Sequence, residues 1–476
     1  MLNIKPKFVC SQTAPPPLSM CLLPLMIVLF LLPPLNLAAQ PKSILDKTVF
    51  VDNTERFYAE SYVVPARVAD SSQIVVIFRM SNDFLSFTKA STQNARQGAF
   101  QATMAVSMEV RDSLGVIRQR IRNSSTVYTN SFEETNDKNS FRYGWQTITV
   151  PPGMYKITLE VLDRGVGQPK RLTLNDVTFH QNGQSTLITS PIFARPVPSK
   201  DRLLLRPYVL SGNVGFGPSD ALALLQVADT SAVQYEYRIR QQPYGALDIR
   251  WWSVDEITGQ ASRSVHRRLR LSEFANSRDP FLEVIDSQEE SSPIALIEVP
   301  LPVTMLVPGS YVLTVVAVGS SDSLTMPFNI VWESMPMSLR NLDYAMKMLK
   351  YTVKESVLDS LNSGNDVERR MHLMGWWRLN DGSPTSTYNE RMAEYYKRVD
   401  QAFAAFSTIQ ESDGADTERA KVYILFGPPT TFDKHLSPNN EPQEEWTYSN
   451  SVKKTFTFTM DQGGIYKLVA ITPIEK

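Results

Sequence analysis

The side chains with the widest range of chemistry lie in the C-terminal part of the chain. They combine carboxylates, guanidinium groups, an amide and a hydroxyl: Asp381, Asn389, Glu390, Arg398, Thr417, Glu418 and Arg419. Two carboxyl groups that face a cleft about 5 to 9 Å apart can act as the acid and the base of a hydrolase, and Asp381, Glu390 and Glu418 are the candidates. The same set can instead form buried ion pairs and helix caps, or line a polar pocket for a peptide or a glycan. Of these three interpretations, the structural network is the one we expect.

The motifs of the common catalytic classes are absent from the sequence. No metal-ligand spacing joins the four histidines, His180, His266, His372 and His435. There is no H-E-x-x-H and no G-x-S-x-G motif, and Gly427-Pro428-Pro429 reads as a structural turn because it lacks the lysine and the free amides of a phosphate-binding loop. We therefore expect no metal, no cofactor and no catalytic residue, which favours a non-enzymatic protein.

Aromatic and basic stretches suggest two further binding chemistries. The tryptophan pairs Trp251-Trp252 and Trp376-Trp377 could stack on sugar rings, but one ring of each pair is expected in a core. The basic stretch Arg263–Arg270 could bind a polyanion, although Glu289-Glu290 lies close in sequence and favours a solvated strand face. The formal net charge of −1 shows no basic excess, so we expect no nucleic-acid partner.

Residues 1–39 are typical of a secretory signal peptide. Lys5 and Lys7 supply the basic start, and the small residues Ala38-Ala39 follow the apolar run Cys21–Leu35. This run is too short, and too often interrupted by proline, to span a bilayer of about 30 Å. We expect cleavage after Ala39, no permanent transmembrane segment, and an exported protein that is periplasmic or extracellular at the cell surface. Both cysteines would be removed, so ordinary hydrophobic cores must stabilise the mature chain.

Strand periodicity dominates the chain up to about residue 333. Gln73–Met80 is mainly β-branched and apolar, whereas Met104–Val110 and Met154–Leu162 alternate apolar with polar or small residues, as half-buried strands do. Short strands at such turn spacings predict β-sandwiches.

A repeated unit divides this β-rich part into two modules. Pro152–Leu159 (PGMYKITL) returns as Pro308–Val315 (PGSYVLTV) at a constant offset of 156 residues. The turn places a tyrosine where its hydroxyl can reach a neighbouring backbone, and the unit resembles the late strands of immunoglobulin-like modules. We predict two such β-sandwich modules, 40–195 and 199–333, joined by a proline-bearing linker, Arg195–Ser199.

The period changes to that of helices in residues 334–476. Leucines and other apolar residues at three- and four-residue spacing predict one helix over Ser338–Leu361. Capping pairs predict a second helix at Asn365 with Glu368 and a third at Thr387 with Glu390. Strands are predicted next, namely Lys421–Phe426, Glu445–Ser449, Thr455–Met460 and Ile465–Ala470. Helices followed by an antiparallel sheet define an α+β domain.

This last domain resembles the GWxTD domain of bacterial exported proteins. One block is Trp377–Pro384 (WRLNDGSP), which is followed by Asn389-Glu390. The second block is Gly414–Pro429 (GADTERAKVYILFGPP), which matches the family pattern closely in its second half. Ala415 stands where the family has tryptophan, and Glu418 where it has aspartate. The resemblance implies export and no established reaction.

Together these patterns predict an exported bacterial envelope protein that serves assembly or partner binding, with envelope proteins or glycans as partners. A carboxylate hydrolase and a glycan- or peptide-binding module are the alternatives. We also predict that Arg419 is buried and paired with a carboxylate, either Asp381 or Glu390, because an unpaired buried charge is strongly unfavourable.

Overall fold

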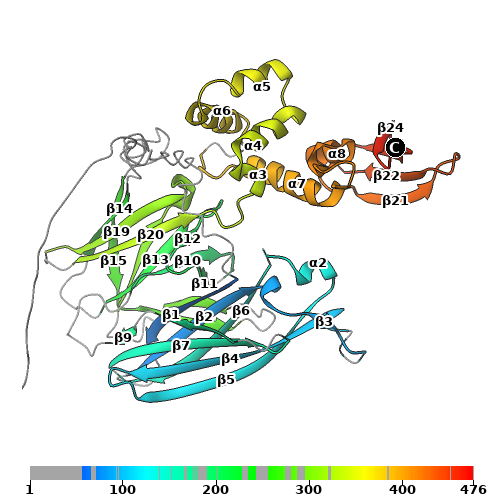
Figure 1. Cartoon of the computed structure of the whole chain (residues 1–476). Helices are drawn as coiled ribbons and strands as arrows, with labels where there is room; N and C mark the ends of the chain where they lie inside the picture. The colour runs from blue at the N-terminus through cyan, green and yellow to red at the C-terminus, as the bar shows by residue number, and fades with distance from the viewer. Residues whose placement is uncertain are drawn as a thin grey trace, which may run out of the picture. The chain divides into compact units, whose positions relative to one another are not determined.

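The computed structural model describes most of residues 56–474 (Figure 1). The longer stretches outside the described residues are 66–70, 180–189, 228–233, 243–255, 274–279 and 287–294. The expected signal peptide and the pair Trp251-Trp252 also lie outside them. The chain is β-rich: several sheets come first, then a group of helices, then a final antiparallel sheet. No helix of the described residues is long and apolar enough to cross a membrane.

The first two sheets enclose one hydrophobic core. Their strands are β1 (Phe57–Pro65), β2 (Ser72–Ser81), β3 (Thr88–Lys89), β4 (Phe100–Asp112), β5 (Ile117–Thr129), β6 (Phe141–Val150), β7 (Gly153–Asp163), β8 (Pro169–Thr173) and β9 (Val177–Phe179). One sheet has the order β1-β2-β6, and the other has the order β3-β4-β7-β8 with β5 on β4 and β9 on β7. Short helices η2 (Asn82–Phe84) and α2 (Phe132–Thr135) lie in the connections. As the alternation predicts, Ile157, Leu159 and Val161 of β7 are fully buried between the sheets.

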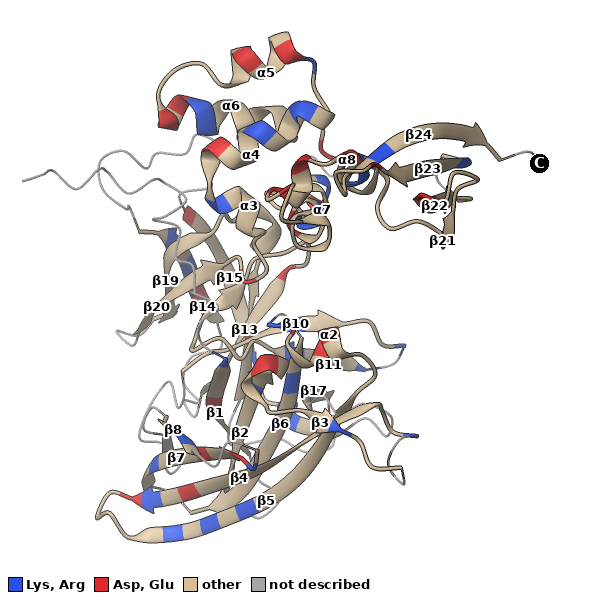
Figure 2. Ribbon diagram, turned by 45° about the vertical axis from the view of Figure 1, so that its right-hand side comes forward, with Lys and Arg blue, Asp and Glu red and all other residues tan. Residues whose placement is uncertain are grey.

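Strand β5 shows how this module protects an edge. It pairs only with β4, and Arg118, Arg120 and Arg122 recur along it, as the blue segments in Figure 2 show. Arg118 pairs with Asp112 at 2.6 Å, and Arg120 pairs with Glu109. Charged side chains along an exposed edge oppose pairing with another chain, so this edge is not a docking strand.

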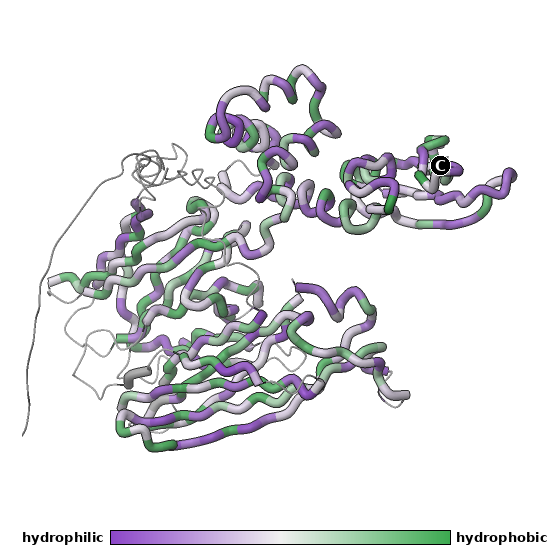
Figure 3. Tube along the Cα trace, in the orientation of Figure 1, coloured by the Kyte–Doolittle hydropathy of each residue, from purple (hydrophilic) through white to green (hydrophobic). Residues whose placement is uncertain are grey.

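The next sheet has eleven strands and folds back on itself. The strands are β10 (Ile192–Val197), β11 (Leu203–Pro207), β12 (Val214–Gly215), β13 (Ala221–Val227), β14 (Gln234–Gln241), β15 (Glu256–Ser264), β16 (Arg267–Glu273), β17 (Pro280–Asp286), β18 (Ala295–Leu301), β19 (Gly309–Ala317) and β20 (Ser323–Val331). Their order is β12-β20-β19-β14-β15-β18-β13-β10-β11-β17-β16. Leu225 of β13 and Leu313 of β19 lie in the same core, so two parts of the sheet face each other. Hydrophobic and hydrophilic segments alternate along these strands (Figure 3).

The predicted linker is part of a strand. Arg195, Pro196 and Val197 belong to β10 and pair with β11. The other neighbour, β13, pairs with β10 only over Ile192–Ala194. Pro196 therefore lies where β10 has a partner on one side only, which a residue without an N–H group tolerates.

Strand β2 is buried on both faces, which explains its continuous apolar run. Ile74, Val76 and Phe78 belong to the core of the first two sheets. Val75 and Ile77 point the other way, into a second core that they share with strands of the eleven-stranded sheet. Because side chains alternate along a strand, only an uninterrupted apolar segment can fill both cores.

The repeated tyrosines both bond to the backbone. The Tyr155 hydroxyl donates to the carbonyl oxygen of Pro151 at 2.9 Å, and the Tyr311 hydroxyl donates to that of Val307 at 2.8 Å. In both copies the acceptor lies four residues before the tyrosine. The predicted reach of these hydroxyls to a neighbouring backbone is confirmed.

Removing either hydroxyl should therefore destabilise its module. We expect Tyr155→Phe and Tyr311→Phe each to lower the free energy of unfolding by about 0.5 to 1.5 kcal/mol, the usual net value of such a hydrogen bond. Urea unfolding of the full chain measures the change. Tyr237→Phe is the matched control, because the Tyr237 hydroxyl makes no hydrogen bond to a described residue. Unchanged midpoints in both test variants would contradict the expectation.

The C-terminal helices form a separate core. They are α3 (Met337–Arg340), α4 (Leu342–Met348), η4 (Leu349–Tyr351), α5 (Glu355–Leu361), α6 (Asp366–Leu379), α7 (Glu390–Phe406), η5 (Gly414–Asp416) and α8 (Glu418–Phe426). The short helix η3 (Val303–Met305) comes earlier, between β18 and β19. The single helix predicted over Ser338–Leu361 is wrong. The Asn341 side chain accepts from the Tyr344 amide and starts α4 anew, and the Thr352 hydroxyl bonds to Leu349 where the chain turns. Local side-chain bonds to the backbone thus interrupt a run whose apolar spacing looked continuous.

The starts of the next two helices follow capping chemistry. Asn365 and Glu368 form the predicted capping box at the start of α6. Helix α7 starts with Asn389 as its N-cap, since the Asn389 side chain accepts from the Met392 amide at 2.8 Å. Thr387, the predicted cap, instead donates its backbone N–H to the Thr304 carbonyl at 2.7 Å.

The segment predicted as the strand Lys421–Phe426 is the second half of helix α8. Ala420 and Ile424 pack on the helical core, whereas Val422 packs on the final sheet. Burial from two sides makes Val422–Phe426 apolar or aromatic throughout, and a short apolar run does not distinguish helix from strand. The final sheet is β21 (Thr431–Leu436), β22 (Pro442–Tyr448), β23 (Lys454–Met460) and β24 (Tyr466–Pro473), in that order. Of these four strands, β21 is the one that the sequence did not predict.

Candidate functional site

The seven polar residues singled out from the sequence do not form one cluster. Asn389, Arg398, Thr417, Glu418 and Arg419 each bond to residues outside the set. Asp381 follows the end of α6, and Glu390 is exposed at the start of α7. The Arg398 side chain on α7 pairs with Glu394 at 2.8 Å. Members of the set therefore contribute to several local structures.

Arg398 instead helps to end helix α8. Its guanidinium lies 3.4 Å from the Ile424 carbonyl oxygen and 3.5 Å from that of Leu425. A positive charge at a helix C-terminus is favourable because the last carbonyl groups have no partner within the helix. Gly427 follows with φ +81°, a left-handed conformation that favours glycine. The turn Gly427-Pro428-Pro429 is thus the exit from a helix, not from a strand.

The first residues of the second block, Gly414–Asp416, pack closely on the helices of the domain. The backbone at Gly414 approaches α7 so closely that a Cβ would lie 2.4 Å from the Phe403 oxygen. Ala415, where the family has tryptophan, is fully buried in the helical core. Burial opposes ionisation of Asp416, but hydrogen bonds from Lys347 of α4 and Lys350 of η4 outweigh it and hold the pKa of this carboxyl below its ordinary value.

The second half of the block fastens α8 to the sheet. The Thr417 hydroxyl caps α8 by accepting from the Ala420 amide at 3.1 Å. Glu418 in the first turn accepts from the Leu468 amide of β24. Its carboxylate is therefore held between a helix N-terminus and an edge strand, where it stabilises the domain.

Arg419 is buried, as predicted, but its partner is Glu444. Arg419 is 8% exposed, and its Nη1 lies 3.5 Å from Oε1 of Glu444, which is 3% exposed. The guanidinium also lies over the rings of Tyr466 at 4.1 Å and Phe406 at 5.0 Å. The prediction of Asp381 or Glu390 as partner is wrong. Period-two alternation could have identified Glu444, since it shares the inward face of β22 with the buried Trp446 and Tyr448.

The pair Trp376-Trp377 does not form a flat stacking platform. Trp377 is buried in the helical core, and Trp376 packs partly against the same core. The two rings meet edge to face at an interplanar angle of 82°. Within the described residues, no group of three His, Cys, Asp or Glu side chains is placed to hold a metal ion.

The two edge strands of the final sheet, β24 and β21, differ in how well they are protected against pairing with another chain. The edge strand β24 is blocked: Glu418 occupies the Leu468 amide, the register shifts near Thr457-Phe458, and the strand ends at Pro473, which has no N–H group. These are features by which proteins prevent pairing at an edge.

The other edge, β21, is open. All six of its residues, Thr431–Leu436, are exposed, and its pairing with β22 runs without a register shift. The apolar side chains of Phe432 and Leu436 are 48% and 59% exposed. Ser437 continues the register with a hydrogen bond to Glu441, so the alternation of an antiparallel ladder directs the amides of Phe432, Lys434 and Leu436 outward. Extended segments of other chains add to regular, exposed edges, and the exposed side chains of Phe432 and Leu436 favour such pairing, whereas Asp433 and Lys434 oppose pairing with unrelated strands.

Fold and site together define a multidomain, β-rich protein whose C-terminal α+β part presents an open sheet edge. Residues 309–468 match the model of the GWxTD domain, so the chain carries a GWxTD domain in its C-terminal region. The match begins at β19, well before the blocks that carry the resemblance. No curated protein matches the chain.

Solved structures give only distant likenesses. Two chains of Bacteroides uniformis β-glucuronidase, one of them a calcium-binding mutant of β-glucuronidase 2, are 8% identical with TM-scores of 0.17. The alignments cover 26% and 27% of this chain but only 13% and 14% of those chains. The BSP domain of a biofilm-associated protein is 8% identical with a TM-score of 0.15, over 62% of this chain and 55% of that one. Likeness at this level supports no conclusion about function.

Proposed function

We propose that this chain is an exported protein of the bacterial cell envelope that binds a protein partner through strand β21, without catalysing a reaction. The observation that carries the proposal is the contrast between the two edges of the final sheet. A side-chain bond, a register shift and a proline block β24, whereas β21 is fully exposed and regular. The partner supplies an extended segment that pairs with β21 as a fifth strand.

The physical basis is main-chain hydrogen bonding. An added strand satisfies the outward amides and carbonyls of the edge, and alternate side chains give specificity. Phe432 and Leu436 lie on the face of β21 that carries Lys434, so an apolar residue of the partner can pack between them. The Lys434 ammonium is 3.2 Å from Glu444 and limits pairing with unrelated strands.

Export and module architecture complete the proposal. The signal-like residues 1–39 support export of the mature protein to the periplasm or the cell surface, where an envelope protein would meet it. Two immunoglobulin-like modules, 40–195 and 199–333, precede the α+β domain 334–476. Facing sheets with a common core and the two tyrosine-to-backbone bonds support this part of the proposal.

Site-specific photo-cross-linking in the native host tests the proposal. The photoreactive residue p-benzoylphenylalanine replaces Asp433 on β21 or, as the matched position, Lys467 on β24. We expect one defined protein adduct from position 433 and none from position 467. Mass spectrometry identifies the adduct, and an extended peptide from that protein should bind the purified chain.

A proline variant distinguishes a partner that pairs with the backbone of β21 from one that only lies close to it. Leu436→Pro removes an outward amide but leaves the pairing with β22 intact. We expect it to abolish both the adduct and the peptide binding, with an unchanged circular dichroism spectrum. Equal adducts from both edges, or peptide binding that survives Leu436→Pro, would overturn the proposal.

A further inference from the structure

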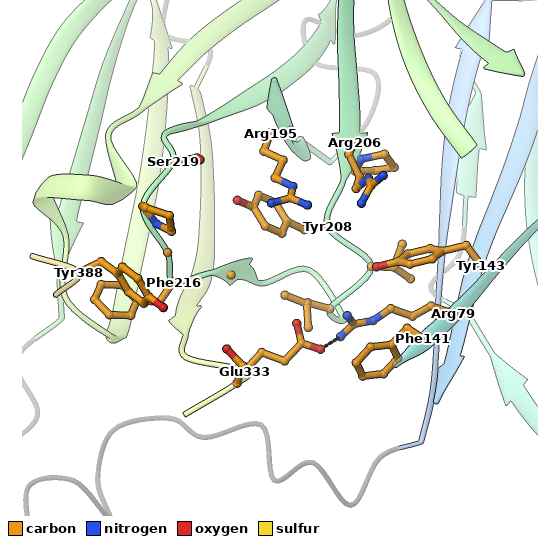
Figure 4. A pocket seen from close by; sticks show the side chains of 17 residues that line it. Arg79, Phe141, Tyr143, Arg195, Arg206, Tyr208, Phe216, Ser219, Glu333 and Tyr388 are labelled. Atoms are coloured by element: carbon orange, nitrogen blue, oxygen red, sulfur yellow. Dashed lines mark ion pairs between the residues drawn. The ribbon is translucent and has the colours of Figure 1, made fainter. Parts of the chain in front are cut away.

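A pocket with a volume of about 330 Å³ is lined mainly by residues that precede the GWxTD blocks, together with Tyr388 next to the first block (Figure 4). It combines Arg79 of β2 and Tyr143 of β6 with Arg195 of β10 and Arg206 of β11. Glu333, just after β20, completes its charged lining. Figure 4 shows Arg195 and Arg206 on one side of the pocket and the pair Arg79–Glu333 on the other.

Arg79 is a buried and rigid part of the wall. The residue is 4% exposed, and its guanidinium lies 4.7 Å from the centroid of the Tyr58 ring and 4.2 Å from that of the Phe141 ring. Its Nη2 lies 2.5 Å from Oε1 of Glu333. The Nε group makes no hydrogen bond to any described residue. Arg79 is thus a buried cation held against two aromatic rings and Glu333, and it contributes positive charge to this wall of the pocket.

Arg195 and Arg206 face each other in the register of β10 and β11. Side chains of directly opposite residues lie on the same face, about 5 Å apart at Cβ, and like charges in such pairs are destabilising. Arg206 lies over the Phe281 ring at 5.2 Å. Arg195 forms no ion pair with a described residue. Two guanidinium groups on the same face of neighbouring strands present several N–H donors to one oxyanion.

The remaining lining supports an anionic ligand. Three arginines and one glutamate are the only charged side chains that line the pocket among the described residues, and the glutamate is already bound to Arg79. Burial raises the pKa of Tyr208 to about 12, although Arg195 opposes this shift. The Tyr208 hydroxyl therefore remains protonated near neutral pH and can donate a hydrogen bond.

We propose that this pocket binds a small organic oxyanion, a carboxylate or a phosphate ester, between the guanidinium groups of Arg195 and Arg206. The Tyr208 hydroxyl donates to the same oxyanion, and the aromatic rings of Phe216 and Tyr388 contact the body of the ligand. This site is separate from β21 and does not depend on the partner proposed above.

Titration calorimetry and thermal melting of the full chain test the inference. The probes are citrate for carboxylates and inorganic phosphate for phosphate esters, each compared with sodium chloride at the same ionic strength. We expect at least one of them to raise the melting temperature and to bind with measurable heat. Arg195→Gln should weaken that binding about 10- to 100-fold, the effect of losing a charge-assisted hydrogen bond.

The stability of the free variant distinguishes a binding residue from a structural one. Without ligand, Arg195→Gln should melt at the same temperature as the parent or higher, because it removes a like-charge contact. Arg206→Gln is the second binding variant. Arg238→Gln is the control, since this exposed arginine of β14 lies outside the pocket. Two results would overturn the inference: no stabilisation by either probe beyond sodium chloride, or equal binding by the parent and both binding variants.

Discussion

Gly414→Ala should lower the free energy of unfolding of the C-terminal domain by roughly 3 kcal/mol or more. A Cβ at this position would lie 2.3 Å from the Ser407 nitrogen, 2.4 Å from the Phe403 oxygen and 2.8 Å from the Ala402 oxygen. All three are backbone atoms at the C-terminal end of α7, so no side-chain rotation can relieve the overlap. The segment before α8 would have to move away from α7.

Gly375→Ala is the matched control for this substitution. Gly375 lies inside α6, and a Cβ there would meet no other atom within 4 Å. Because glycine is a poor helix former, the control should raise stability by about 0.5 to 1 kcal/mol. Hydrogen exchange of the α8 amides in the full chain measures local stability for both variants. Similar protection of α8 in Gly414→Ala and the parent would refute the close-approach argument.

Arg419→Met should destabilise the domain by roughly 3 to 5 kcal/mol, the usual cost of breaking a buried ion pair. The substitution leaves the Glu444 carboxylate buried, with the largely exposed Lys434 as its remaining cation. It also removes the guanidinium from the rings of Tyr466 and Phe406. Methionine keeps most of the side-chain volume, so the loss reports the charge and its contacts more than a cavity.

Two comparisons isolate the ion pair. Replacing both partners, Arg419→Met with Glu444→Leu, should recover part of the stability because no unpaired buried charge remains. Arg398→Met removes a guanidinium whose carboxylate partner, Glu394, is half exposed, so its cost should be about 1 kcal/mol or less. If Arg419→Met melts like the parent, Arg419 does not stabilise the domain through Glu444.

Features that depend on local periodicity and local bonding could be predicted from the order of the amino acids. Alternation identified β4 and β7 and their buried faces, because side chains of a strand point to opposite sides whatever packs on them. The turn before Tyr155 and Tyr311 placed each hydroxyl within reach of the carbonyl four residues earlier. Asn365 with Glu368 started a helix for the same reason, since a capping box involves only one turn of chain.

Contacts between groups that are distant in sequence depend on how whole helices and strands pack. Lys421–Phe426 is helical because it fills the space between the helical core and the final sheet, and its composition suits a buried strand equally well. Arg419 pairs with Glu444 because α8 packs on β22, and Arg195 faces Arg206 because two strands align in one register. Periodicity specifies which face of an element is buried, but the packing of whole elements selects the partner of each buried charge.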